Sequence, residues 1–167
     1  MIDFALTADA VAPQLLGCTL THAGVSIRLT EVEAYLGAED SAAHTFNGKT
    51  PRNAAMFGPP GKFYVYISYG IHRNVNIVCA PDGTGQGCLL RGGEIVEGAD
   101  IAFARRGTTD FHNLARGPGN LGKALGFTLE DNHQPIQIVE RTSEPEWVRG
   151  PRIGISNNKE APLRFWI

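Results

Sequence analysis

Two acidic side chains alternate in the segment TEVEAY, where Glu31 and Glu33 precede Tyr35. The surrounding residues have the composition of a β-strand, and every second side chain of a strand points to the same face. Ile27, Leu29, both acids and the tyrosine are therefore expected on one face. Burying a carboxylate without a partner is unfavourable, so the two acids need either a structural partner or a chemical task.

A general base is the chemical task that suits a buried glutamate. A desolvated carboxyl near a second acid tends towards a raised pKa, which matches proton abstraction near neutral pH. For one buried glutamate the simpler interpretation is a carboxylate held by backbone amides, Arg or Lys. Two acids in alternate positions, followed by Tyr35 and then His44 in a loop with Gly and Asp, favour a site instead.

The stretch KFYVYISYG (62–70) is rich in aromatic and β-branched residues and predicts a strand. Alternation places Tyr64 and Tyr66 on one of its faces and Tyr69 on the other. Core packing is the expected role of Tyr64. Tyr66 could instead join other aromatic residues in a cage for a planar ring.

Tyr35, His44 and Tyr66 are the candidates for that cage. Nucleobases are held between aromatic faces in this way. Tyr69 precedes Gly70, so it could stand at the tip of a turn and fill the gap left by a base withdrawn from the stack.

Two further polar residues lie beside apolar strand patterns. Arg91 closes the run GCLL before Gly92 and Gly93, where a surface charge or an ion pair is the usual role. Its guanidinium could also pair with Glu33 or with a phosphate. Asn76 in NVNIVCA is either a satisfied buried amide or a group that reads the edge of a base.

Metal chemistry is an alternative that the residue types allow. The possible ligands are Glu31, Glu33, His44, His72 and His112. None of them shows a recognised ligand spacing, and no P-loop, nucleophile elbow or dinucleotide fingerprint is present. Neither a metal nor a cofactor is expected.

The composition describes one soluble globular domain spanning 1–167, with 43% hydrophobic and 19% charged residues. Cys18, Cys79 and Cys88 are odd in number and lack a C-x-x-C spacing, which favours a reducing cytoplasm over a disulfide framework. A nucleoid-associated location is expected if the source is bacterial. No apolar run approaches the roughly 20 residues of a membrane span.

The net charge of −2 argues mildly against a nucleic-acid partner. The charge is unevenly distributed, however, because residues 41–123 hold nine Lys and Arg against five Asp and Glu. A basic middle of this kind fits a phosphate-facing surface, and it also fits an ordinary solvated face.

Short elements joined by many turns follow from the 20 glycines and 10 prolines. The expected elements are a helix within 7–17, a hairpin over 18–35 that turns at 22–24, strands over 62–70, 74–80 and 87–96, helices within 96–107 and 119–127, and strands over 135–140 and 162–167. They predict an α+β fold, a single mixed domain with a curved, mostly antiparallel β-sheet and short peripheral helices.

Several blocks of the sequence resemble one known family. They are TEVEAYLGAEDSAAH (30–44), TPRNAAMFGPPGKFYVYISYG (50–70), NVNIV (74–78), CLLRGGE (88–94), RGPGNLGKALG (116–126) and GPRIGIS (150–156). In this order they resemble the alkyladenine DNA glycosylases, also called 3-methyladenine DNA glycosylases, from about residue 8 to 166. The resemblance implies that family's fold.

The resemblance also implies roles for individual residues. Glu33 matches the general base that activates a water to attack C1′ of a flipped nucleotide. Tyr35, His44 and Tyr66 match the pocket that holds the base, and Tyr69 matches the side chain that enters the duplex in its place.

Asn76 matches the residue that disfavours the exocyclic amino group of guanine. Arg91, together with the backbone carbonyl of Ile153, matches the group that positions the water and the neighbouring backbone. The family approaches phosphates at Thr50 and Arg52, and His72 is expected on the same DNA-binding side.

A monofunctional glycosylase follows from the resemblance, since no lysine is implicated as a nucleophile. Its expected partner is double-stranded DNA that contains alkylated bases, and the chain is expected to act as a monomer. A non-catalytic module that recognises damaged DNA on the same fold is the alternative. The departures from the family pattern are Asn120 where a basic residue is common, the Gly92-Gly93 pair, and a chain that stops at FWI.

Overall fold

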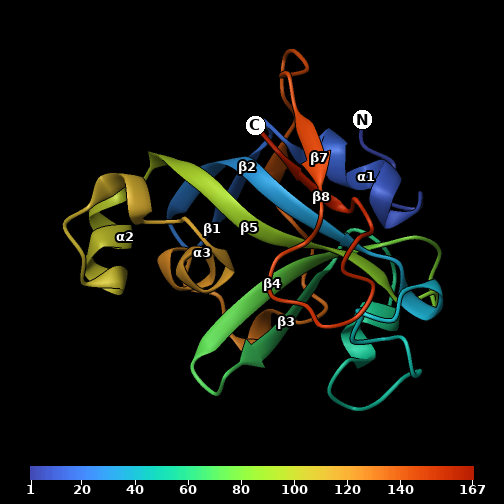
Figure 1. The fold of residues 1–167 in the computed structure, drawn as a ribbon. Helices are drawn as coiled ribbons and strands as arrows, with labels where there is room; N and C mark the ends of the chain where they lie inside the picture. The colour runs from blue at the N-terminus through green and yellow to red at the C-terminus, as the bar shows by residue number, and fades with distance from the viewer.

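Two long strands, β2 (Val25–Tyr35) and β5 (Gln86–Glu97), run antiparallel and side by side through the middle of the molecule (Figure 1). The computed structural model describes residues 1–167. The other strands are β1 (Thr19–His22), β3 (Phe63–Ser68), β4 (His72–Cys79), β6 (Ile138–Val139), β7 (Val148–Gly150) and β8 (Arg164–Trp166). They form an eight-stranded sheet of order β3-β4-β5-β2-β1-β6, in which β8 joins the end of β2 to β7 and every pairing is antiparallel.

The pairing of β2 with β5 is interrupted at its centre. Glu31 pairs with Gly92, and this pairing leaves Thr30 on one strand and Arg91 on the other without a cross-strand partner. Such bulges change the direction of the side chains that follow. Arg91 ends the apolar run GCLL but lies inside a long strand, as the strand predicted over 87–96 requires.

The interruption decides which face each acid occupies. The apolar row continues from Leu29 to Val32 in the hydrophobic core, whereas Glu33 and Tyr35 line a cavity. The prediction that Glu33 shares the face of Ile27 is therefore wrong. The acid does not interrupt the core, because the bulge turns it away from the core.

Gly93 is required where the two strands approach each other at this bulge. A Cβ atom at Gly93 would lie 2.7 Å from Cδ1 of Ile27 and 3.0 Å from the carbonyl oxygen of Arg28. Glycine in a strand often marks such a close backbone approach. The second glycine of the pair that follows Arg91 thus has a structural reason.

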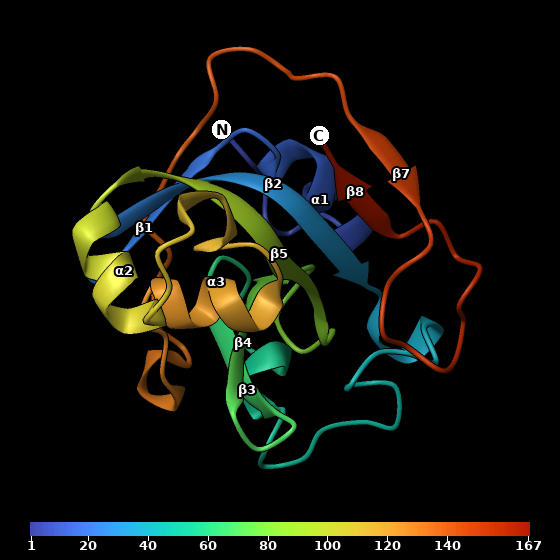
Figure 2. The ribbon, with the colours of Figure 1, turned by 60° about the vertical axis from the view of Figure 1, so that its left-hand side comes forward.

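Three short α-helices flank the sheet. They are α1 (Ala8–Leu15), α2 (Ala99–Arg106) and α3 (Pro118–Ala124). In both views α2 and α3 lie together at one end, and α1 lies near the two chain termini (Figures 1 and 2). A core of 28 buried apolar residues joins the helices to the sheet. None of the helices is long and apolar enough to cross a membrane.

The α+β fold class with its mostly antiparallel sheet is confirmed. The first hairpin turns at Ala23 and Gly24, whose φ angles of 45° and 85° suit a two-residue hairpin loop. The expected strand over 135–140 is reduced to the two residues of β6, and β7 was not predicted. Single turns of 3₁₀ helix occur at Gly37–Glu39, Ala54–Phe57, Phe111–Asn113 and Leu129–Asp131.

Candidate active site

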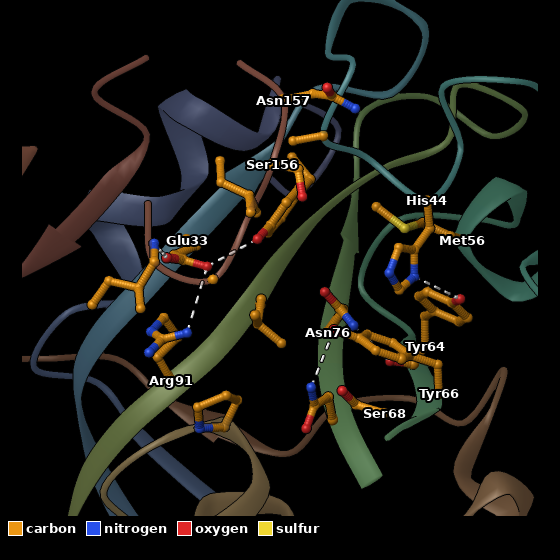
Figure 3. A pocket seen from close by; sticks show the side chains of 18 of the residues that line it. Glu33, His44, Met56, Tyr64, Tyr66, Ser68, Asn76, Arg91, Ser156 and Asn157 are labelled. Atoms are coloured by element: carbon orange, nitrogen blue, oxygen red, sulfur yellow. Dashed lines mark hydrogen bonds and ion pairs between the residues drawn. The ribbon is translucent and has the colours of Figure 1, made fainter. Parts of the chain in front are cut away.

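A cavity of about 420 Å³ opens where the C-terminal end of β2 and the first half of β5 meet the β3–β4 hairpin. Eight of the eleven predicted site residues line it, namely Glu33, Tyr35, His44, Tyr66, Tyr69, Asn76, Arg91 and Ile153. Figure 3 shows Glu33 and Arg91 on one side of the cavity, with His44, Tyr64 and Tyr66 on the other. An acidic wall therefore faces an aromatic wall.

Glu33 is completely buried and held by two hydrogen bonds. Its Oε1 accepts one from the hydroxyl of Tyr35 at 2.9 Å, and its Oε2 accepts one from the backbone N–H of Ile153 at 2.8 Å. The guanidinium of Arg91 lies 3.7 Å from Oε1. The carboxyl group is thereby fixed at the cavity wall.

The surroundings of Glu33 raise the pKa of its carboxyl group. Burial is the largest cause, and it outweighs the opposing effects of Arg91, the Ile153 N–H and the Tyr35 hydroxyl. The negative charge of Glu31 raises the pKa further. A carboxylate that holds a proton more tightly is also a better proton acceptor, which is the property of a general base.

Glu31 does not line the cavity, and its partners are basic. Its Oε2 accepts hydrogen bonds from Nε of Arg91 at 3.4 Å and from Nη1 of Arg164 at 3.1 Å. Arg91 therefore bridges the two acids. Glu31 holds one end of this guanidinium while the other end reaches Glu33.

The opposite wall is aromatic. The ring of His44 meets that of Tyr66 edge to face at 4.3 Å, and the ring of Tyr64 lies 5.7 Å from that of Tyr66. Tyr64 is buried as expected, but it lines the cavity with Met56 instead of packing in the main core. Sequence reasoning therefore missed Tyr64 as a wall of the site.

His44 is a neutral member of this wall near pH 7. Burial lowers the pKa of its imidazole, and the positive charge of Arg52 lowers it further. A neutral ring does not repel a cationic ligand, so the aromatic wall can accept a positively charged ring by cation–π attraction.

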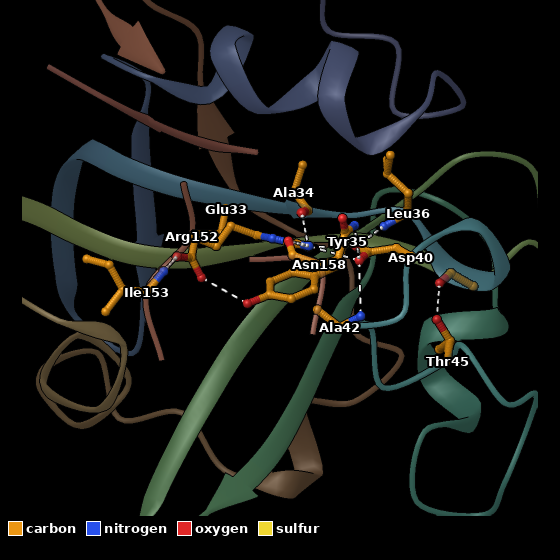
Figure 4. A network of polar contacts seen from close by, with 11 residues as sticks. Glu33, Ala34, Tyr35, Leu36, Asp40, Ala42, Thr45, Arg152, Ile153 and Asn158 are labelled. Carbon is orange, nitrogen blue, oxygen red and sulfur yellow. Dashed lines mark hydrogen bonds and ion pairs between the residues drawn. The ribbon is translucent and has the colours of Figure 1, made fainter. Parts of the chain in front are cut away.

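The ring of Tyr35 is held from behind by a buried ion pair. The guanidinium of Arg152 lies over this ring at 4.6 Å and binds both oxygens of Asp40 at 2.6 and 2.8 Å (Figure 4). Arg152 also donates to the carbonyl of Ala34. This contact joins the loop that carries Ile153 to the end of β2, and the sequence gives no local sign of it.

Tyr69 stands at the tip of the β3–β4 hairpin beside the mouth of the cavity. It is 90% exposed and has a φ of +52°, a left-handed conformation that is uncommon for a tyrosine. Its aromatic ring is thus presented to solvent at the edge of the site. The prediction of a turn-tip position for Tyr69 agrees with this geometry.

Three predicted DNA-side residues lie outside the cavity lining. The backbone N–H of Thr50 donates to Asn53, and Arg52 donates to the carbonyl of Ile67 beside a smaller hollow of about 250 Å³. His72 is exposed on β4 and packs against Gly119, where a Cβ would lie 2.6 Å from Nδ1. Their predicted roles toward DNA remain predictions.

The five possible metal ligands are not gathered into one place. No group of three or more His, Cys, Asp or Glu side chains is arranged to hold a metal ion. Asn74 and Leu89 also line the cavity and were not predicted. Asn74 lies two residues before Asn76 on β4, so strand alternation could have identified it.

The sequence matches known proteins over nearly its whole length. Residues 2–167 match the sequence model of the methylpurine-DNA glycosylase (MPG) family. A protein of Corynebacterium efficiens named "Putative 3-methyladenine DNA glycosylase" is 68% identical, with 99% of this chain and 90% of the relative covered. Relatives with the same name in Corynebacterium glutamicum and Rhodopseudomonas palustris are 66% and 47% identical, covering 99% and 98% of this chain and 91% and 82% of their own. The chain belongs to the methylpurine-DNA glycosylase family.

Proposed function

We propose that this chain is a monofunctional DNA glycosylase of base excision repair. It removes alkylated purines, 3-methyladenine foremost, from double-stranded DNA by hydrolysing the N-glycosidic bond. The observation that carries the proposal is the buried Glu33, fixed by Tyr35 and the Ile153 N–H, which faces an aromatic wall across a cavity of about 420 Å³.

The damaged nucleotide leaves the duplex before the chemistry starts. Tyr69, exposed at the hairpin tip, fills the space in the stack from which the nucleotide has turned. Unstacking is least unfavourable for damaged bases, so this step contributes to selectivity. The basic middle of the sequence, including Arg52, provides charges for the phosphates.

The flipped base lies between Tyr35 and the wall of His44 and Tyr66. Methylation at a ring nitrogen makes the base cationic, and a cation on an aromatic face is favoured by roughly 0.5–2 kcal/mol. The neutral state of His44 avoids a like-charge repulsion at this point.

Glu33 then accepts a proton from the attacking water. The oxygen of this water bonds to C1′, the C1′–N bond breaks, and its electron pair stays with the base, which leaves neutral. The sugar passes through an oxocarbenium-like state whose positive charge a nearby carboxylate offsets. Arg91 and the Ile153 carbonyl position the water.

Hydrolysis without strand cleavage is proposed because no lysine lines the cavity to form a Schiff base. We further propose that the chain acts as a monomer in the cytoplasm, associated with the nucleoid if its source is bacterial. Sedimentation equilibrium of the free chain and of its complex with a lesion duplex would measure the subunit number.

The test is release of free 3-methyladenine from methylated duplex DNA, in EDTA, by wild type and by Glu33→Gln. The variant should lose about 10²–10⁴-fold in single-turnover rate because it lacks the base. Glu39→Gln is the matched control, since Glu39 is an exposed acid of the following loop. It should react at the wild-type rate.

Three outcomes would contradict the proposal or the role that it gives Glu33. Lesion binding by wild type without any base release would favour a non-catalytic recognition module, and activity that EDTA abolishes would favour a metallohydrolase. Wild-type activity in Glu33→Gln would refute the role of Glu33. Filter binding at increasing salt should show a steep loss of affinity, because phosphate contacts release counterions.

A further inference from the structure

Arg164 on β8 is the second cation that binds Glu31. Its Nη1 donates to Oε2 of Glu31 at 3.1 Å, and Nε of Arg91 donates to the same oxygen at 3.4 Å. Two guanidinium groups therefore share one carboxylate oxygen, and of the two Arg91 alone also reaches Glu33 (Figure 3). The charge that Arg91 presents to Glu33 thus depends on how firmly Arg164 holds Glu31.

Three contacts fix the guanidinium of Arg164. Besides Glu31, its Nε donates to the carbonyl of Pro151 at 2.8 Å, and the group lies 3.9 Å from the centre of the Trp166 ring. In the register of β2 with β8, Glu31 pairs with Trp166, two residues beyond Arg164. Glu31 and Arg164 are therefore diagonal neighbours, within reach of long side chains. An ion pair between mobile exposed side chains contributes little, whereas this one is held in place and the Arg164 side chain is only 20% exposed.

The charged and titratable side chains around the two acids come from four strands. They are Tyr35 of β2, Tyr66 of β3, Arg91 of β5 and Arg164 of β8. Burial raises the pKa of both tyrosine hydroxyls, so they stay neutral over the pH range in which a carboxyl group titrates. The two arginines remain cationic throughout. The balance between two arginines and two acids therefore sets the charge at Glu33.

Removal of Arg164 would change this balance in one direction. The carboxylate of Glu31 would lose its second cation and would attract Arg91 more strongly, away from Glu33. Its less neutralised charge would also disfavour the ionised form of Glu33 directly. We infer that Arg164 is a positioning residue, which by occupying Glu31 keeps the Arg91 charge available to the general base. This inference rests on the proposed function, in which Glu33 is that base.

The test is the pH–rate profile of single-turnover base release by Arg164→Met, which removes the charge and keeps an unbranched side chain. Its acidic limb should move to higher pH, so that its rate on this limb falls about two- to fivefold below wild type, the effect of one partly exposed ion pair. The plateau rates, where Glu33 is ionised in both proteins, should stay close to each other. Arg164→Lys keeps a cation at Glu31 and should restore the wild-type limb.

Arg149→Met is the matched control. Arg149 of the neighbouring strand β7 donates through Nε to the carbonyl of Pro162 at 2.9 Å and lies 4.8 Å from the centre of the Phe165 ring, but it pairs with no acid. Lost packing beside β8 would affect both variants, whereas lost charge at Glu31 affects Arg164→Met alone. The limb of Arg149→Met should coincide with that of wild type, and an equal shift would overturn the inference. Thermal unfolding of each variant checks that the fold is intact.

The double variant Glu31→Gln/Arg164→Met shows whether the effect passes through Glu31. Its limb should coincide with that of Glu31→Gln alone, because Arg164 then has no charge to neutralise. A further shift of full size in this background would contradict the inference. So would a limb of the single variant Arg164→Met that stays in place or moves to lower pH.

Carbon-13 NMR of the Glu33 carboxyl carbon separates this inference from the proposed function. It follows the titration of Glu33 in the free protein without DNA, and Glu33→Gln assigns the signal. In Arg164→Met the signal should titrate at higher pH than in wild type. Wild type that releases no base would refute the proposed function, whereas an unchanged Glu33 titration in Arg164→Met would refute the inference alone.

Discussion

Glu33 and Asp40 are both completely buried carboxyl groups, seven positions apart, yet their surroundings shift their pKa values in opposite directions. The carboxylate of Asp40 accepts hydrogen bonds from both terminal nitrogens of the Arg152 guanidinium, from the side-chain amide of Asn158 and from two backbone N–H groups. Burial works to raise its pKa, but these hydrogen bonds outweigh it and hold the pKa at about 2.

Glu33 has fewer and weaker donors. One neutral hydroxyl and one backbone N–H reach it, and its nearest guanidinium nitrogen is 3.7 Å away. Burial therefore prevails and the pKa rises. The comparison teaches that burial does not separate a structural acid from a reactive one, whereas the number and charge of its donors does.

The largest expected effect in this comparison is on stability. Asp40→Ala leaves the guanidinium of Arg152 buried without its partner, which should lower the free energy of unfolding by about 3–5 kcal/mol. Urea denaturation measures the change. Glu39→Ala, at the exposed neighbour, should stay within about 0.5 kcal/mol. A loss below 1 kcal/mol for Asp40→Ala would mean that the ion pair is not a structural anchor.

These two acids also show what the sequence could and could not predict. Glu33 was a candidate because a strand pattern that contains acids is locally visible. The face that Glu33 occupies could not be predicted, because the bulge beside Arg91 depends on cross-strand pairing. The only local sign was the adjacent Gly92-Gly93 pair, since glycines in a strand mark bulges.

The pairing of Asp40 with Arg152 was even harder to predict from the sequence than the face of Glu33. The two residues are 112 positions apart, and each alone looks like an ordinary surface charge. Turns and strands were predictable because glycine and β-branched residues act locally. The hydrogen bond from the Ile153 N–H to Glu33 joins distant segments and was not predicted, because the family resemblance pointed to the backbone carbonyl of Ile153 and not to its N–H.

The pH dependence of catalysis should separate the two acids. Single-turnover release should fall about tenfold per pH unit below the raised pKa of Glu33, because only the carboxylate accepts the proton. The stability that Asp40 contributes is complete above the ordinary aspartate pKa of about 3.9 and is lost only as the pH falls towards 2.

The fold should therefore remain intact near pH 4–5 while activity declines. Circular dichroism at each pH checks the fold, and incubation without enzyme corrects for spontaneous base loss. Loss of activity that coincides with unfolding would remove the distinction between the acids.

Glu33→Gln should stabilise the protein at pH 7. Because the pKa of Glu33 is higher in the folded chain, the unfolded chain loses the Glu33 proton first as the pH rises. The free energy of unfolding therefore falls between the unfolded-state and the folded-state pKa of Glu33. The neutral amide removes this loss, and a gain of about 0.5–2 kcal/mol is expected, as for other active-site substitutions. Thermal unfolding of both proteins at pH 7 and pH 4 measures it. The gain should shrink at pH 4, and a destabilised variant at pH 7 would contradict the argument.

The smallest expected effect concerns Glu31, the acid that shares Arg91 with Glu33. Glu31 is partly exposed, so Glu31→Gln should change the free energy of unfolding by less than about 1 kcal/mol. Its catalytic effect should be a shift of the acidic limb of the pH–rate profile to lower pH. Removing the Glu31 charge lowers the pKa of Glu33, and Arg91 is then free to approach Glu33, which acts in the same direction. A shift of the acidic limb to higher pH would contradict this prediction. It would show that Glu31 does not act by competing with Glu33 for the positive charge of Arg91.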